Sequence, residues 1–406
     1  MPGVRRRPVS LLLLVGLLAL AAAASAPAAE APLAPRLARA LSVPDVARAS
    51  TAGLAVDLRT GAVVFGRNAG APLAPASTEK LAVTYALLAA LGPDFRIKTE
   101  VLGDGAQDGT TWRGDLVLKG YGDPTLSSAD LRRLAARVAA AGVTRVTGAV
   151  IGDESFFDSA RTAPGWKPSF YGDESPPLSA LSVDRGWYRG MMVGDPALAA
   201  GRLFTKALGE AGVTVLHKAR TGIAADDDLP LATVASPPLA AIVAMMDRES
   251  DNFTAELLLK ELGALYDDRG TTAGGAAAVR DLLGNVGVPL AGVRIADGSG
   301  LSLLDRLTAQ ALVAILEASW LDPDIRPTLV AALPVAGVSG TLESRMRRAP
   351  ARGNVIAKTG TTDEASALAG YVRGRYVFAV LQNGHPVSTT WARAAQDRFA
   401  TLLAGQ

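Results

Sequence analysis

The sequence predicts an α/β fold in which one domain, an antiparallel sheet flanked by helices, is interrupted by a smaller inserted α+β domain. Its 406 residues are more than a single compact core usually holds. Hydrophobic residues make up 49% of the chain and charged residues 20%, which is typical of a soluble globular protein. Short strand-like and turn-like stretches dominate residues 100–236, whereas hairpins and helices are expected on both sides. We therefore expect residues 29–99 and 237–406 to form one domain and residues 100–236 the insertion.

The first 28 residues have the pattern of an export signal. Three arginines, Arg5 to Arg7, precede an apolar run that extends from Leu11 to about Ala24. The run is too short for a lasting membrane span, and Ala26-Pro27-Ala28 provides a small-x-small cleavage pattern. We expect cleavage near Ala29 and an exported protein, periplasmic or associated with the cell wall, without a stable transmembrane anchor.

Composition excludes several classes of function. The formal charge of +2 becomes about −1 without the three signal arginines, so a nucleic-acid partner is not expected. The chain has no cysteine, which excludes a cysteine nucleophile, thiolate metal ligands and disulfides. Only His217 and His385 are present, without a His-Glu-x-x-His pattern, which argues against a zinc peptidase. No cofactor or metal is expected.

The expected elements of the main domain lie at both ends of the chain. Hydrophobic periodicity predicts an early helix over 37–49 and a hairpin of strands at 54–58 and 63–65. Near the C-terminus we expect a strand over 353–360, a hairpin over 366–382 and a last helix over 391–403. Within the insertion, the expected elements are strands at 115–119 and 146–151, helices at 129–141 and 198–211, and a strand at 213–215.

Ser77 and Lys80 form the first candidate catalytic pair. Pro75 and Ser77 are signals for the start of a helix, and apolar residues continue at helical spacing to Leu91. Lys80, three residues after Ser77, lies on the same helix face, where a neutral amine can remove the proton of the serine hydroxyl. Alone, the pair is weak, because roughly one such match is expected by chance in a chain of this length.

Two further motifs make the pair specific. Ser250-Asp251-Asn252 and Lys358-Thr359-Gly360 follow in chain order. The chain prefers arginine to lysine, yet both motif positions hold lysine, whose amine can lose its proton when buried. The three motifs must meet in one cleft, although 173 residues separate Ser77 from Ser250 and 108 separate Ser250 from Lys358. The strand-rich stretch between the first two motifs is therefore best explained as an inserted domain.

Longer strings resemble a known family. The three motifs together are typical of serine β-lactamases and penicillin-binding proteins. Pro75 to Leu81, Gly122 to Leu126, Asp297 to Ser302 and Leu333 to Gly337 resemble the D-alanyl-D-alanine carboxypeptidase/endopeptidase family, the class C low-molecular-mass penicillin-binding proteins. The resemblance covers nearly all of the mature chain. It implies a β-lactamase/DD-peptidase-like domain with a second domain inserted after the first motif.

The resemblance also implies roles for the motif residues. Ser77 would attack the carbonyl between two D-alanines of a peptidoglycan stem peptide and form an acyl-enzyme, with Lys80 as the base. Ser250 and Lys358 would return a proton to the leaving amine. Asn252, also catalytic, would orient Lys80 and bind the substrate's amide. The substrate-binding residues would be Thr359, Gly360 and Thr361. The backbone N–H groups of Ser77 and Thr361 would form the oxyanion hole, and β-lactam antibiotics would acylate Ser77.

Neighbouring polar residues have structural interpretations. Asp251 is expected to bond nearby backbone, and Asp297 with Ser299 to form a turn that shapes the cleft. His385 is expected to be structural.

Two departures from the family pattern affect specificity. A third small domain that often follows a string like Leu178 to Ser182 looks absent, because the chain passes quickly to Ala197. An arginine often follows Asp-Gly-Ser-Gly-Leu-Ser, suited to a substrate carboxylate, but this chain has Leu303. We expect an altered peptide preference with complete acylation machinery.

Two other functions remain open on the sequence alone. A serine β-lactamase shares the three motifs but must deacylate a β-lactam rapidly. A non-catalytic wall-binding relative would retain the fold, although the presence of every motif side chain argues against it.

Overall fold

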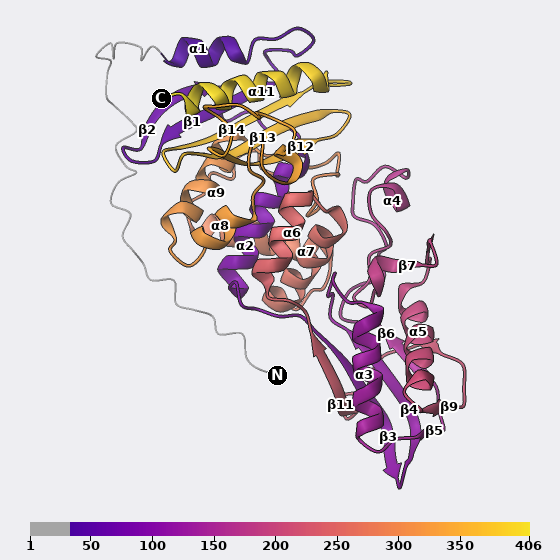
Figure 1. Ribbon diagram of the computed structural model, residues 1–406. Coiled ribbons are helices and arrows are strands. Elements are labelled where there is room, and N and C mark those ends of the chain that lie inside the picture. The colour runs from indigo at the N-terminus through magenta and orange to yellow at the C-terminus, as the bar shows by residue number, and fades with distance from the viewer. Residues whose placement is uncertain (1–32) are drawn as a thin grey trace.

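The computed structural model describes residues 33–406, so the predicted signal over residues 1–28 lies outside the described residues. The described chain contains two large sheets, each with its own helices (Figure 1). One sheet lies beside the N-terminal helix and the last helix, and the other lies at the opposite end of the molecule. The main sheet carries one of the three motifs, and helices packed below it carry the other two.

The main sheet is antiparallel and joins strands from both ends of the chain. Its order is β12-β13-β14-β1-β2. The strands are β1 (Thr51–Asp57), β2 (Ala62–Arg67), β12 (Val355–Thr361), β13 (Ala365–Val372) and β14 (Tyr376–Asn383). Ala55 of β1 faces Phe378 of β14 in the register, so the N-terminal hairpin extends the C-terminal one.

Alternating side chains make both faces of this sheet apolar. In β14, Phe378 and Val380 pack with α1 (Leu33–Ala40) and α11 (Thr389–Ala404). Val377, Ala379 and Leu381 point to the other face and join the core of the helical layer. Successive strand residues point to opposite faces, so a strand buried on both sides is apolar throughout.

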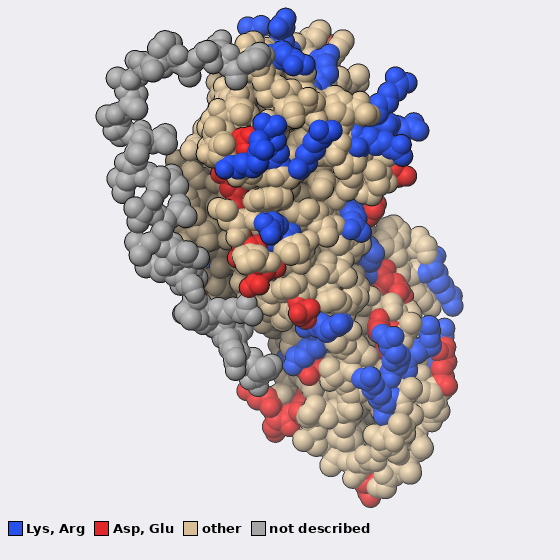
Figure 2. All heavy atoms as spheres, turned by 60° about the vertical axis from the view of Figure 1, so that its left-hand side comes forward, with Lys and Arg blue, Asp and Glu red and all other residues tan. Residues whose placement is uncertain are grey.

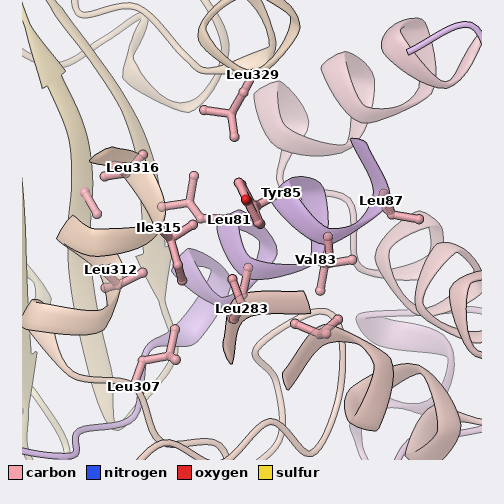
Figure 3. Close-up of a cluster of buried hydrophobic side chains, with 14 of the residues drawn as sticks. Leu81, Val83, Tyr85, Leu87, Leu283, Leu307, Leu312, Ile315, Leu316 and Leu329 are labelled. Carbon is pink, nitrogen blue, oxygen red and sulfur yellow. The ribbon is translucent and has the colours of Figure 1, made fainter. Parts of the chain in front are cut away.

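The helical layer surrounds α2 (Lys80–Leu91), which is buried on nearly all sides. Leu81, Val83, Tyr85 and Leu87 point outward from this helix into its neighbours (Figure 3). The surrounding helices are α6 (Leu239–Glu249), α7 (Asn252–Asp267), α8 (Thr272–Asn285), α9 (Ala309–Leu321) and α10 (Arg326–Ala332). The helix that begins next to Ser77 is therefore held from every side.

The second sheet is built from residues 98–235 and has a separate core. Its strands are β3 (Lys98–Asp108), β4 (Thr111–Gly120), β5 (Arg145–Val146), β6 (Val150–Asp153), β9 (Thr214–Val215), β10 (Arg220–Thr221) and β11 (Leu229–Ala235). Helices α3 (Ser128–Ala140) and α5 (Pro196–Glu210) pack on it around Trp112 and Phe204. The division into residues 29–99 with 237–406 and residues 100–236 stays a prediction.

Between β6 and α5 the chain returns to the helical layer. Phe157 and Leu178 pack against Phe253 of α7. This segment includes α4 (Phe170–Asp173) and a hairpin of β7 (Trp187–Tyr188) and β8 (Met191–Met192). The hairpin lies in the part of the chain where the sequence predicts that the third small domain of the family is absent.

Two element predictions were wrong. The first helix ends at Ala40, not Ala49, because Pro44 disfavours helical geometry at Val43 and removes a backbone donor. The strand expected over 146–151 is divided into β5 and β6. Between them, Gly148 lies so close to β4 that an added Cβ would be 2.1 Å from Asp115 Oδ1. The other strands and helices predicted above lie at their expected positions within a few residues.

Charged side chains of both signs are interspersed on the surface that Figure 2 shows, with basic ones more frequent towards the end that holds the main sheet. Within residues 33–406, no helix is long and apolar enough to cross a membrane.

Candidate active site

Ser77 and Lys80 are brought together by a short 3₁₀ turn. Residues Ala76–Glu79 form this turn, and α2 begins at Lys80. In a 3₁₀ helix, side chains three residues apart lie one above the other. The Lys80 Nζ atom accordingly lies 3.1 Å from Ser77 Oγ. The predicted pairing of these two side chains on one helix face is present.

Two glycines allow other segments to approach this turn. An added Cβ on Gly360 would lie 2.7 Å from the carbonyl oxygen of Pro75. Gly300 has a φ of +83°, and its Cβ would lie 2.0 Å from the carbonyl oxygen of Ala76. Only glycine fits such close backbone approaches. The Lys-Thr-Gly strand and the loop after Asp297 therefore lie directly against Ser77.

The surroundings of Lys80 favour a neutral amine. Its Nζ lies 2.9 Å from Asn252 Oδ1 and 2.6 Å from the backbone oxygen of Ser299. Both oxygens accept hydrogen bonds from the amine, whose third neighbour is the Ser77 hydroxyl oxygen. Complete burial lowers the pKa of Lys80 below its usual 10.5, against the opposing charge of Asp297.

Ser250 and Lys358 form a second hydroxyl–amine pair. Ser250 follows the last turn of α6 with φ 60° and ψ 38°, a left-handed conformation that is uncommon outside glycine. Lys358, on β12, donates to Ser250 Oγ at 2.8 Å. Burial, followed by the charge of Lys80, lowers the pKa of Lys358 to about 7, although Asp247 opposes the shift.

Asn252 is fixed by the start of α7. Asp251 caps this helix by accepting from the N–H of Thr254 at 2.7 Å, and Arg185 Nη2 donates to it at 2.5 Å. Burial favours the neutral acid, but these partners outweigh it, so the pKa of Asp251 lies below its usual value. The structural role predicted for Asp251 matches these contacts.

Ser77, Ser250 and Asn252 line a cleft of about 570 Å³. Residues 361–363, which directly follow the Lys-Thr-Gly motif, also line it. Phe170 and Glu174 come from the second sheet's segment, and Asn252 Nδ2 donates to Glu174 at 3.3 Å. All three motifs, 173 and 108 residues apart in the chain, therefore meet at this cleft.

The Asp297 loop forms a buried turn, as expected. Asp297 accepts from the N–H groups of Gly300 and Ser302 and from Ser299 Oγ at 2.7–2.9 Å. The indole Nε1 of Trp166 donates to Asp297 at 2.7 Å. The turn delivers the Ser299 carbonyl to Lys80 and connects the cleft to the inserted segment.

Sequence reasoning missed a group of buried carboxyl groups behind Lys80. Glu79, Glu256 and Asp305 lie around Asp297, and each has a carboxyl oxygen without a hydrogen-bond partner among the described residues. Burial, and then the charge of Asp297, raises the pKa of all three, that of Glu256 to about 8. The only signal was an acidic residue next to an apolar run, as with Glu256 before Leu257 to Leu259.

The contacts of two further side chains with the Lys-Thr-Gly strand were also missed. Thr359 Oγ1 donates to Thr341 Oγ1 at 2.8 Å. Arg393 of α11 donates from Nη2 to Thr361 Oγ1 at 3.2 Å. Thr341 lies in Gly340-Thr341-Leu342, a string that also resembles the family, but the sequence assigned no role to it or to Arg393, because only the fold brings them to the strand.

Residues 33–406 contain no group of three or more carboxylate or histidine side chains placed to hold a metal ion. His385 follows the end of β14 and is exposed.

Comparison with known proteins agrees with this geometry. The chain is 34% identical to a D-alanyl-D-alanine carboxypeptidase of Actinomadura sp. (strain R39), over 90% of this chain and 83% of that protein. The structure resembles penicillin binding protein 4 from Haemophilus influenzae with a TM-score of 0.80 and 21% identity, covering 92% of this chain and 99% of that one. A complex of the latter with a β-lactam aligns with a TM-score of 0.73 and 22% identity, over 91% and 98% of the two chains.

These similarities confirm the predicted fold class and the predicted enzyme class, a serine-type D-Ala-D-Ala carboxypeptidase. Residues 33–192 and 189–406 match the model of the D-Ala-D-Ala carboxypeptidase 3 (S13) family, and the chain therefore belongs to that family.

Proposed function

We propose that this protein is exported and removes the terminal D-alanine from peptidoglycan stem peptides by way of an acyl-enzyme on Ser77. The observation that carries this proposal is the contact of 3.1 Å between Ser77 Oγ and a buried amine whose other two neighbours are acceptors. Such an amine can take the hydroxyl proton as the new bond forms.

The residues act in two proton transfers. Ser77 Oγ attacks the carbonyl carbon between the two D-alanines, and its proton passes to Lys80. The tetrahedral intermediate collapses with cleavage of the C–N bond, and the departing amine takes a proton through Ser250 from Lys358. The same two transfers run in reverse in deacylation: water attacks the ester and gives a proton to Lys358, while Lys80 returns its proton to Ser77 Oγ, which releases the shortened peptide and restores the Ser77 hydroxyl.

Strand β12 and the residues around it bind the substrate. The N–H groups of Ser77 and Thr361 are suited to hold the developing oxyanion, an effect often worth about 3 kcal/mol of barrier. The hydroxyls of Thr359 and Thr361 are suited to the terminal carboxylate of the substrate, and Gly360 keeps the strand close to Ser77. Asn252 binds the substrate amide as well as Lys80.

The same mechanism makes the protein a target for β-lactams. Opening of the lactam ring by Ser77 gives an ester whose leaving amine stays attached, so water enters slowly. Mass spectrometry of the intact protein after exposure to penicillin tests this: we expect an adduct that persists for many minutes and maps to Ser77. Rapid turnover of the drug would identify a β-lactamase instead.

Peptide hydrolysis tests the peptidase itself. The wild type should release D-alanine from a pentapeptide that ends in D-Ala-D-Ala, and Ser77→Ala should not. Absence of both release and a penicillin adduct in the wild type would favour a non-catalytic wall-binding protein.

Leu303 affects which stem peptide is preferred rather than the acylation of Ser77. Its side chain is 39% exposed and does not belong to the lining of the cleft. We propose that a free carboxylate at the end of a stem-peptide side chain is bound less tightly here than by relatives with arginine at this position. The variant Leu303→Arg should lower KM for such a peptide without changing penicillin acylation.

A further inference from the structure

A second cavity, of about 530 Å³, lies beside the catalytic strand and has no role in the mechanism above. Two glycines and five polar side chains line it. The polar ones are Thr341, Glu343, Ser344, Arg347 and Arg352. None of them belongs to the three motifs, and none lines the cleft at Ser77.

The cavity is next to the Ser250–Lys358 pair. Thr341, on its wall, bonds to Thr359, whose carbonyl oxygen accepts from Lys358 Nζ at 3.1 Å. Residues Gly340–Leu342 form a 3₁₀ turn wedged between β12 and the end of α6. An added Cβ on Gly340 would lie 2.7 Å from the Arg248 carbonyl, two residues before Ser250. One turn of chain therefore separates the cavity from the group that protonates the leaving amine.

The arginines of the cavity are free to bind an anion. Among residues 33–406, nearby Arg345 is bound to Asp397 at 2.7 Å, whereas neither Arg347 nor Arg352 has an ion-pair partner. Both are exposed, and Glu343 is the one acidic side chain of the lining. Two guanidinium groups and two hydroxyls line one cavity, and arginine binds carboxylates with paired hydrogen bonds.

We propose that this cavity is a leaving-group subsite that binds a carboxylate of a second stem peptide, attached to the amine that departs from Ser77. The inference rests on the proposed function. A single departing D-alanine has one carboxylate, which Thr359 and Thr361 engage, so it has no group left for the cavity. A cross-linked peptide places a whole stem peptide, with further carboxylates, beyond Ser250 and Lys358. Cross-linked dimers are therefore the substrates on which this subsite would act, and free pentapeptides are not.

The test compares the two substrates with the double variant Arg347→Ala/Arg352→Ala. We expect kcat/KM for a cross-linked dimer to fall about tenfold, mainly through KM, as loss of a charged hydrogen bond predicts. D-Alanine release from the pentapeptide and the rate of penicillin acylation should stay within about twofold, because both use only the cleft at Ser77. Raising salt from about 0.05 to about 0.5 M should weaken dimer cleavage by the wild type more than by the variant.

Arg348→Ala is the matched control, because this neighbouring arginine is exposed but does not line the cavity. Equal losses on both substrates, an equal effect of Arg348→Ala, or unchanged dimer cleavage would overturn the inference. So would a wild type that releases D-alanine but does not cleave the dimer. Failure of the proposed function looks different, since the wild type would then neither release D-alanine nor retain penicillin.

Discussion

At the residue scale, the reactivity of Ser77 depends on how the buried charges around Lys80 and Lys358 are balanced. After burial, the charge of Lys80 lowers the pKa of Lys358, since protonation of one amine disfavours protonation of its neighbour. Asp247 of α6 opposes this effect, because its carboxylate stabilises both ammonium forms. The pH above which Lys358 can no longer donate its proton is therefore set by Asp247 as well as by Lys80.

Replacing Asp247 by asparagine should move that limit. The wild-type rate of penicillin acylation should fall as pH rises through about 7, the pKa of Lys358, because the neutral amine has no proton to give to the leaving amine. Asp247→Asn removes a charge that favours protonated lysine, so Lys358 loses its proton at lower pH. The midpoint of this alkaline limb should move down by about half a unit to one unit. The amide oxygen still accepts from Thr84, which preserves the bond of 2.8 Å.

The control is Glu249→Gln, which removes the same charge from an exposed position on the same helix. It should leave the midpoint unchanged. A midpoint that moves upward in Asp247→Asn would contradict the role given to this carboxylate.

The carboxyl groups behind Lys80 make a second prediction, on stability. Burial and Asp297 raise the pKa of Glu256 to about 8, above the usual 4.5. The stabilisation from its bound proton is therefore complete below pH 4.5 and is lost as pH rises through about 8. Glu256→Gln cannot ionise and keeps an acceptor for the N–H groups of Gly298 and Ser299. Relative to wild type, its free energy of unfolding should rise by roughly 1–4 kcal/mol from pH 5 to pH 8.

Urea unfolding at the two pH values measures this difference. Glu210→Gln, an exposed change on α5, should show no such pH dependence. Parallel pH curves for wild type and Glu256→Gln would mean that Glu256 is already ionised in the folded protein.

The motif residues could be predicted from the sequence because their shared chemistry requires a fixed spacing between them along the chain. Ser77 and Lys80 are three positions apart, and that spacing survives in any sequence that folds this turn. Glu79, Asp247 and Glu256 could not be found in this way. Their importance comes from complete burial next to Lys80 or Lys358, and burial of a carboxyl group depends on which elements pack around it.

At the element scale, the site depends on where α6 ends and α7 begins. Asp251 caps α7 and lies between Ser250 and Asn252, so one residue positions both motif side chains. Its contact with Arg185 also fixes the segment from the second sheet. A cap at this position therefore affects both helix stability and cleft geometry.

Asp251→Ala should lower both stability and acylation. Loss of a helix cap costs about 1 kcal/mol, and release of Arg185 adds to it. Fraying of the first turn also moves Asn252 from Lys80, so penicillin acylation should slow by about tenfold. Thr271→Ala provides the control, because Thr271 caps α8 through Gly274 at 2.9 Å without lining the cleft. It should lose similar stability and keep its acylation rate; equal slowing in both variants would contradict the positioning role.

Helices and strands could be predicted from the sequence where the spacing of hydrophobic residues and the turn residues indicate the same element. The C-terminal hairpin has both, with Arg373-Gly374 between two apolar runs, and it forms as β13 and β14. The helix predicted to reach Ala49 ends at Ala40 because Pro44 outweighs the apolar period around it. The pairing of β1 with β14 could not be deduced from local signals, since more than 300 residues separate them.

At the scale of the whole molecule, the two sheets have separate cores but share the cleft. The core around Trp112 and Phe204 includes no residue of the main sheet. Yet Trp166, Glu174 and Arg185, from the segment between β6 and α5, bond directly to the Asp297 loop, Asn252 and Asp251. We therefore expect two unfolding steps, with the second sheet able to unfold first and to take one wall of the cleft with it.

Trp112→Ala separates these steps. The indole is 2% exposed and packs over Gly103, so its removal should cost about 3–5 kcal/mol within the second sheet alone. Calorimetry should show a first transition at lower temperature, while a second stays near its wild-type position. Penicillin acylation should be normal at 25 °C and should disappear with the first transition, because the cleft wall belongs to the part that unfolds.

Phe399→Ala, in the core between α11 and the main sheet, should lower the temperature of the second transition instead. A single transition shifted equally by both variants would mean that the two cores unfold as one unit, and acylation that survives the first transition would mean that the inserted segment does not support the cleft.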